Sequence, residues 1–139
     1  GAGDVITLFD GDTYVIAGSG DDTVTTTGNF NDYVLGDHGA IGWSTSGIIE
    51  HMTSDKDAKH LGGSDTLSLA DGHHWVIGGF GADTITAGIG NDIVLGDNGV
   101  ATFTAGTLTR LESTDADDTT GGNDIINLGH GNTNIIGGA

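Results

Sequence analysis

The sequence contains no cysteine and no proline, and only Lys56, Lys59 and Arg110 among its 139 residues are basic. The absence of cysteine excludes disulfide bonds and thiolate metal sites. The scarcity of basic side chains argues against nucleic acid as a partner, because contacts to phosphates need a basic surface. An anionic membrane surface would repel the chain for the same reason.

Long apolar runs and enzyme motifs are also missing. No apolar segment approaches the roughly 20 residues of a transmembrane helix, and the N-terminus carries no signal-peptide pattern. There is no G-x-S-x-G elbow, no phosphate-loop lysine and no acid–base pair apart from repeated aspartates. The sequence therefore predicts no membrane insertion and no catalytic activity. Helical periodicity is absent throughout, which favours an all-β fold.

Glycine and aspartate dominate what is present. The chain has 27 glycines and a formal net charge of −17, and 18 of its 20 acidic residues are aspartate. A solvated acidic surface would contain more glutamate. Aspartate favours tight turns and sites for hard cations, since its short side chain holds the carboxylate close to the backbone.

The chain repeats itself with a period of about 60 residues. The stretch "DYVLGDHG" at 32–39 returns as "DIVLGDNG" at 92–99, and "GGSD" at 62–65 returns as "GGND" at 121–124. We divide the single domain 1–139 into modules 1–61, 62–120 and a partial third, 121–139. We interpret the whole as an excerpt from a longer array whose neighbouring repeats are its first partners.

A nine-residue period lies inside each module. Residues 62–97 divide into four pieces, "GGSDTLSLA", "DGHHWVIGG", "FGADTITAG" and "IGNDIVLGD", each with an apolar sixth residue: Leu67, Val76, Ile85 and Val94. Nine residues suit one short strand and one tight turn. Two pieces then make one turn of a flattened coil, with the sixth residues inside and successive coils stacked as parallel strands.

Residues 78–86 read G-G-F-G-A-D-T-I-T and match the nonapeptide G-G-x-G-x-D-x-U-x; "AGSGDDTVT" at 17–25 and "AGIGNDIVL" at 87–95 match with alanine first. The chain thus resembles the calcium-binding RTX repeats that carry this nonapeptide. The resemblance implies a right-handed parallel β-roll, a β-solenoid with Gly/Asp turns that bind several Ca²⁺ ions. It also implies secretion or a place on the bacterial cell surface, with folding outside the cell.

Calcium is favoured over magnesium, because Ca²⁺ takes about six to eight oxygens in irregular geometry. The aspartates 18 residues apart are expected to stack on one edge, with Asp32 and Asp92 on the other. The candidate ligands are the aspartates and the turn glycines: Asp4, Asp22, Asp32, Asp37, Asp65, Asp83, Asp92, Asp97 and Asp124, with Gly18, Gly20, Gly78, Gly79, Gly81, Gly88 and Gly90. Asp115 and Asp117 form a further possible site.

The stretches 38–61 and 98–120 do not follow the nonapeptide. Each is predicted to form one more coil, which would place Phe103 and Leu111 beneath Val94, and Trp43 and Met52 at the corresponding places. The alternative is a protruding hairpin that turns at Ala105–Gly106. We favour the coil, because a hairpin would leave Phe103 and Trp43 exposed on a two-stranded ribbon, which is marginally stable in water.

The function that this pattern favours is structural: a calcium-rigidified stalk or spacer of a large secreted adhesin or surface protein. The alternative is an accessory calcium-dependent folding module of a secreted enzyme, of protease or epimerase type, or of a toxin. A module that binds a carbohydrate or another surface ligand is a third possibility. His73 and His74 are expected in solvated or turn-stacking roles, and Trp75 as a surface stacking residue.

Overall fold

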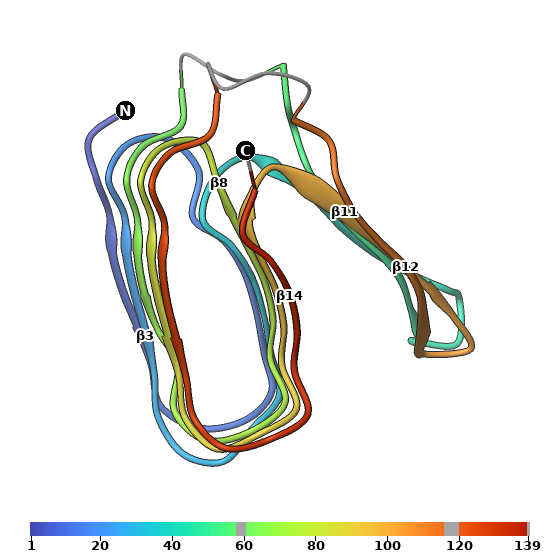
Figure 1. Cartoon of the computed structure of the whole chain (residues 1–139). Helices are drawn as coiled ribbons and strands as arrows, with labels where there is room; N and C mark the ends of the chain where they lie inside the picture. The colour runs from blue at the N-terminus through green and yellow to red at the C-terminus, as the bar shows by residue number, and fades with distance from the viewer. Residues whose placement is uncertain (58–60, 116–119, 139) are drawn as a thin grey trace.

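The computed structural model describes residues 1–57, 61–115 and 120–138 (Figure 1). All regular secondary structure within these ranges is β, as the sequence predicts, and no helix occurs in them. In particular, these residues contain no helix long and apolar enough to cross a membrane.

Ten strands form two parallel five-stranded sheets. Sheet A has the order β1 (Val5–Leu8), β3 (Thr23–Thr26), β7 (Thr66–Ser68), β9 (Thr84–Ala87) and β13 (Ile125–Leu128). Sheet B has the order β2 (Thr13–Ile16), β4 (Asp32–Leu35), β8 (Trp75–Gly79), β10 (Ile93–Asp97) and β14 (Asn134–Ile136). The chain passes alternately between the two sheets, so that each winding contributes one strand to sheet A and one to sheet B (Figure 1). We call these ten strands the stack.

The interior of the stack is filled by the residues that the nine-residue period places sixth. Val24, Val34, Leu67, Ile85 and Val94 are completely buried. They belong to one cluster with Val15, Val76, Leu69 and Ala87. Neighbouring strands align these positions, as in the pairs Val24↔Leu67 and Leu67↔Ile85. The predicted inward row is therefore confirmed, and each strand supplies mainly one aliphatic side chain to a thin core.

The prediction of extra coils at 38–61 and 98–120 is wrong. The described parts of these stretches form two antiparallel hairpins, β5 (Gly39–Trp43) with β6 (Ile49–Ser54) and β11 (Gly99–Thr104) with β12 (Thr107–Ser113). Strand β11 also pairs with β6, which joins both hairpins into one sheet of order β12-β11-β6-β5. We call it the hairpin sheet. The stack consequently contains five windings and not seven.

Turn chemistry explains why the hairpins form. Ala105 and Gly106 adopt φ values of 51° and 76° between β11 and β12, and two positive φ angles are what a tight two-residue hairpin turn requires. Between β5 and β6 the turn contains Gly47 at φ 78°. Its amide donates to the Ser44 carbonyl at 3.0 Å.

Because the two hairpins pair with each other, neither is an isolated two-stranded ribbon of marginal stability. One face of the hairpin sheet packs on the outer face of sheet B, where Met52 and Phe103 join Leu35, Ile77 and Leu95 in a second buried cluster. Leu111 is half-buried against this cluster rather than beneath Val94. Trp43 stays 37% exposed, with its ring edge-on to Tyr14 at 4.8 Å.

Candidate metal centre

Five aspartates stand in a column along one edge of the stack, each directly before a strand of sheet A: Asp4, Asp22, Asp65, Asp83 and Asp124. We call them the Asp column. The backbone N–H of each of the first four members donates to Oδ1 of the member one winding further on. The four bonds, in order from Asp4, measure 2.6, 2.7, 2.8 and 2.9 Å. The stacking predicted for aspartates 18 residues apart is confirmed, and one oxygen of each later carboxylate is used to hold the windings together.

The second oxygen of these carboxylates has no such partner. Oδ2 of Asp22, Asp65, Asp83 and Asp124 is buried and makes no hydrogen bond within the described chain. Asp22, Asp65 and Asp83 are each only 1% exposed. A buried anionic oxygen without a partner costs several kcal/mol as an order of magnitude. This row of oxygens therefore calls for a proton or a cation.

Glycine carbonyl oxygens face the same oxygens. A methyl group added at Gly78 would collide with both Asp83 Oδ2 and the carbonyl oxygen of Gly96. The arrangement recurs one winding away on each side. At Gly36 the two atoms are Asp65 Oδ2 and the Gly78 carbonyl oxygen, and at Gly96 they are Asp124 Oδ2 and the Gly137 carbonyl oxygen. Glycine is needed here because any side chain would fill the point on which a carboxylate and a carbonyl oxygen converge.

Burial shifts the protonation equilibria of this edge. Loss of solvation raises the pKa of Asp83 to about 9 and that of Asp65 to about 7, and neighbouring carboxylates in the column add to both shifts. Burial likewise raises the pKa of Asp124 to about 6. Asp65 and Asp83, which are ordinarily ionised well below neutral pH, thus hold their protons into the neutral range, chiefly because burial disfavours the charged carboxylate.

The turn glycines divide into two groups. Gly18, Gly20, Gly79 and Gly81 have φ angles between 97° and 117°, a region that glycine enters without strain. The backbone of these turns consequently depends on them. Gly78, Gly88 and Gly90 do not have positive φ, and are fixed instead by close approach of a neighbouring winding, as where a methyl group on Gly90 would meet the Gly72 carbonyl oxygen.

Asp37 and Asp97 lie at the same edge but have a different role. Asp37 follows β4 and accepts from the amides of Gly63 at 3.2 Å and Phe80 at 2.5 Å. Asp97 ends β10 and accepts from the Gly122 amide at 3.0 Å. Each carboxylate ties the point where a hairpin leaves the stack to the point where the chain returns. Burial raises the pKa of Asp37 to about 6.

The opposite edge carries Asp32, His74 and Asp92, as the spacing predicts. Asp32 accepts from the hydroxyls of Thr13 at 2.7 Å and Thr26 at 2.8 Å. Asp92 accepts from the His74 amide through Oδ1 at 3.0 Å, while its Oδ2 is buried without a described hydrogen bond. Of the two roles expected for His74, the solvated one is wrong and the turn-stacking one agrees with its hydrogen bond to Asp92: His74 is 1% exposed, and its ring lies between Asp32 Oδ2 at 3.4 Å and the Ala70 carbonyl at 3.0 Å. His73, by contrast, is exposed.

The site differs from a cage of side chains. Within residues 1–57, 61–115 and 120–138, no group of three or more His, Asp and Glu side chains lies within reach of one ion. Any cation on the Asp column would draw on backbone carbonyl oxygens as well as on carboxylates. Sequence reasoning missed Gly36, Gly96 and Gly137 at these positions. The repeated "LGD" and "IGG" tripeptides were the available signal.

Of the further candidate pair, Asp115 and Asp117, only Asp115 belongs to the described residues. Asp117 lies outside the described residues. Asp115 accepts from the Asn98 amide at 3.0 Å and from the Thr120 hydroxyl at 2.8 Å. These bonds close the base of the second hairpin and give Asp115 a structural role.

Comparison with known proteins gave no match: no family model, no curated protein and no solved structure matches this chain.

Proposed function

We propose that the chain is a calcium-binding parallel β-roll of the RTX type, a right-handed solenoid that folds and becomes rigid when Ca²⁺ binds. The observation that carries the proposal is the row of buried Oδ2 atoms without a hydrogen bond, in which those of Asp65, Asp83 and Asp124 each lie close to a glycine carbonyl oxygen. A carboxylate together with carbonyl oxygens is the set of hard ligands that Ca²⁺ prefers.

The Asp column is where the ions would bind. Oδ2 of Asp65, Asp83 and Asp124 supplies the anionic ligands, and the carbonyl oxygens of Gly78, Gly96 and Gly137 supply neutral ones. Bound Ca²⁺ provides the positive charge that this edge lacks. The Oδ1 atoms stay in the hydrogen bonds that join the windings, so that ion binding and stacking of the windings do not compete.

The function proposed for such an element is mechanical and non-catalytic. Parallel strands add about 4.8 Å per winding, so a roll grows in proportion to its repeats and suits a stalk or spacer of a secreted adhesin or bacterial surface protein. A chain whose fold needs abundant calcium stays unfolded where free calcium is scarce and folds outside the cell. The ~60-residue period favours this reading over an accessory folding module of a secreted enzyme or toxin, which remains the alternative.

Removal and return of calcium test the proposal. At about pH 8 in excess chelator we expect the far-ultraviolet circular dichroism signal of the strands to be lost, because the net charge of −17 acts against a thin core. Millimolar Ca²⁺ should restore it, and Mg²⁺ at the same concentration should not. A chain that keeps the same melting temperature with and without chelator would contradict the proposal.

A further inference from the structure

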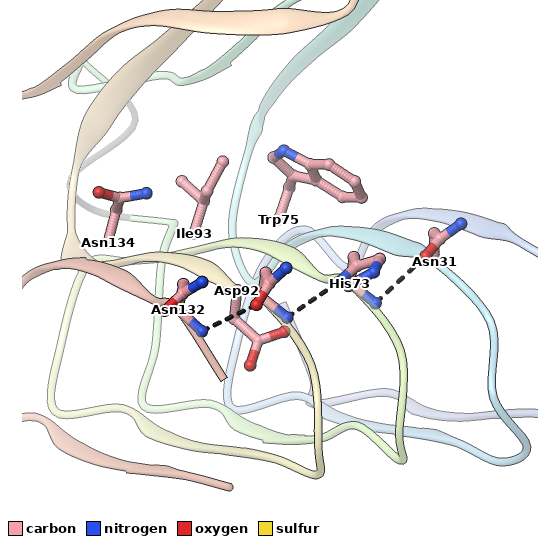
Figure 2. Close-up of a pocket in the computed structure, with 8 residues that line it drawn as sticks. Asn31, His73, Trp75, Asp92, Ile93, Asn132 and Asn134 are labelled. Carbon is pink, nitrogen blue, oxygen red and sulfur yellow. Dashed lines mark hydrogen bonds between the residues drawn. The ribbon is translucent and has the colours of Figure 1, made fainter. Parts of the chain in front are cut away.

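A second feature of the stack lies on the opposite edge and goes beyond calcium binding. Two rows of side chains run side by side across the windings there (Figure 2). Trp75, Ile93 and Asn134 are aligned partners on β8, β10 and β14 and form the first row. The second row is a ladder of turn residues: Asn31, His73, Asn91 and Asn132. Between them lies a hollow of about 280 Å³.

The ladder determines which atoms the second row presents. The His73 amide donates to Asn31 Oδ1 at 3.1 Å, the Asn91 amide to His73 Nδ1 at 2.8 Å, and the Asn132 amide to Asn91 Oδ1 at 2.8 Å. The side chains of Asn31, His73 and Asn91 are thereby fixed with the acceptor atom toward the next winding. Their remaining polar atoms are donors, namely the amide NH₂ groups of Asn31 and Asn91 and Nε2–H of His73. No hydrogen bond from these donors occurs within the described chain.

The first row supplies an apolar surface of a particular shape. Tyr33 stacks on Trp75 with ring centroids 4.4 Å apart and planes at 3°, and Tyr14 continues the stack at 5.1 Å. The rings therefore face along the axis of the stack. The stacked series ends at Trp75, because the next position is Ile93, and Phe103 meets the indole edge-on at 6.4 Å. Trp75 and Ile93 both line the hollow and form its apolar wall.

The chemistry of the hollow excludes other ligand classes. An anion would meet a net charge of −17. A cation would meet a row of N–H donors, which repel positive charge. A purely apolar ligand would leave these donors without water or acceptor. What fits is a neutral ring with apolar C–H faces and hydroxyl groups around its rim.

We propose that this hollow binds a pyranose ring of a neutral oligosaccharide or polysaccharide, with its C–H face on the apolar row of Trp75 and Ile93 and its hydroxyl groups toward Asn91, Asn132 and Asn134. The ladder and the ring series follow the axis of the stack, and adjacent windings are about 4.8 Å apart. An extended sugar chain lying along the axis therefore meets a new donor at each winding. A chain is favoured over a single sugar for this reason.

Titration of the calcium-loaded, ¹⁵N-labelled protein with neutral hexasaccharides tests the proposal. We would use cellohexaose, laminarihexaose and maltohexaose, with glucose as the single-ring comparison. We expect at least one hexasaccharide to bind more tightly than glucose and to shift the indole N–H resonance of Trp75 and the side-chain amides of Asn91 and Asn132. The indole of Trp43, which lies outside the hollow, should not move.

Asn91→Asp provides a sharp variant, because it keeps the oxygen that accepts from the Asn132 amide and replaces the NH₂ donor with a charged acceptor oxygen. We expect the Kd to rise about tenfold, because the variant loses the hydrogen bond that the amide donates to a sugar hydroxyl. Asn123→Asp makes the same change at an exposed residue of the other edge and should leave the Kd unaltered. Failure of all three hexasaccharides to bind at millimolar concentration, a shift confined to Trp43, or equal effects of both variants would overturn the proposal.

Discussion

The stack and the hairpin sheet bury their residues on different principles. Inside the stack the core consists of aliphatic side chains, and its windings also bury the carboxylates of Asp22, Asp65 and Asp83. The hairpin sheet buries larger side chains, Met52 and Phe103, against the outer face of sheet B. Among the described residues of its four strands, Ser54 is the one buried polar group, and its hydroxyl accepts from the Gly99 amide at 2.9 Å.

This difference shows what each region depends on. The stack needs its carboxylates neutralised, whereas the hairpin sheet needs an apolar surface to lie on. That surface is supplied by Leu35, Ile77 and Leu95 of sheet B. The hairpin sheet therefore cannot outlast the stack, although the two should respond differently to mutation. The predictions below probe this contrast, beginning with the largest expected effect.

Gly78→Ala should damage the stack most. Its methyl group would collide with Asp83 Oδ2 and the Gly96 carbonyl oxygen, which are the proposed ligands. We expect a loss of about 3 kcal/mol in the free energy of unfolding and fewer bound Ca²⁺ ions by calorimetric titration. Gly137→Ala is the matched control, because it changes the equivalent glycine of the last winding, where nothing lies within 4 Å. Equal effects of the two variants would contradict the assignment of this point as a ligand site.

Met52→Ala should destabilise the hairpin sheet without changing calcium binding. Met52 is completely buried in the second cluster, and truncation of such a side chain costs about 3 kcal/mol. The number of calcium ions bound at saturation should stay that of the unaltered chain. Ile48→Ala, at a residue of the same hairpin that is 43% exposed, should have a much smaller effect on urea unfolding. A loss of bound calcium in the Met52 variant would show that the two regions are not separable.

Protonation of the buried aspartates should stabilise the metal-free stack, as calcium does in the calcium-loaded chain. In the metal-free chain burial raises the pKa of Asp65 to about 7 and of Asp83 to about 9, against an ordinary value of about 3.9 in the unfolded chain. Folding therefore takes up protons. The stabilisation is complete below about pH 4 and is lost as the pH rises through about 7 and 9.

The measurement is far-ultraviolet circular dichroism in chelator, in which the chain that is unfolded at about pH 8 should regain strand signal at about pH 5. The folded state should gain at least about 1.4 kcal/mol at the lower pH, roughly the equivalent of one pKa unit. With saturating calcium the difference should shrink or reverse, since protons and calcium compete for the same oxygens. A metal-free chain that loses stability on acidification would show that the carboxylates of the column are not the source of instability.

The stack was predictable because its signals are local. A nine-residue piece holds its own turn and strand, and the 18-residue spacing of Asp65 and Asp83 equals one winding, so the inward row and the Asp column follow from counting. The resemblance of 78–86 to the RTX nonapeptide points to the same turns. Ligands from the backbone could not be found in this way. Every residue has a carbonyl oxygen, so the sequence does not show which of them, such as that of Gly96, lies close to a carboxylate.

The hairpins were mispredicted because their stability is non-local. Each hairpin alone is a marginal ribbon, and what stabilises it is pairing of β6 with β11 from the following module. Two windings advance the stack by about 9.6 Å, and a hairpin adds two strands of the same total width. The hairpin sheet and the stack therefore grow in step. This match accounts for a module of two windings and one hairpin, and an alternating pattern of residues does not reveal it.

The smallest expected effect comes from Asp83→Asn, and its sign should depend on calcium. The amide keeps Oδ1 available to the Asp65 N–H, a bond of 2.8 Å, and places an N–H₂ group where Oδ2 faces a glycine carbonyl oxygen. Without calcium at about pH 5, folding of the variant no longer has to take up the proton that Asp83 binds, so the free energy of unfolding should rise by about 1 kcal/mol. With calcium, the loss of an anionic ligand should lower both stability and affinity. Asp10→Asn, at an exposed turn residue with no described partner, should be neutral in both states. A variant that is destabilised equally with and without calcium would mean that Asp83 serves only the winding-to-winding hydrogen bonds, and the comparison of stack and hairpin sheet would lose its electrostatic basis.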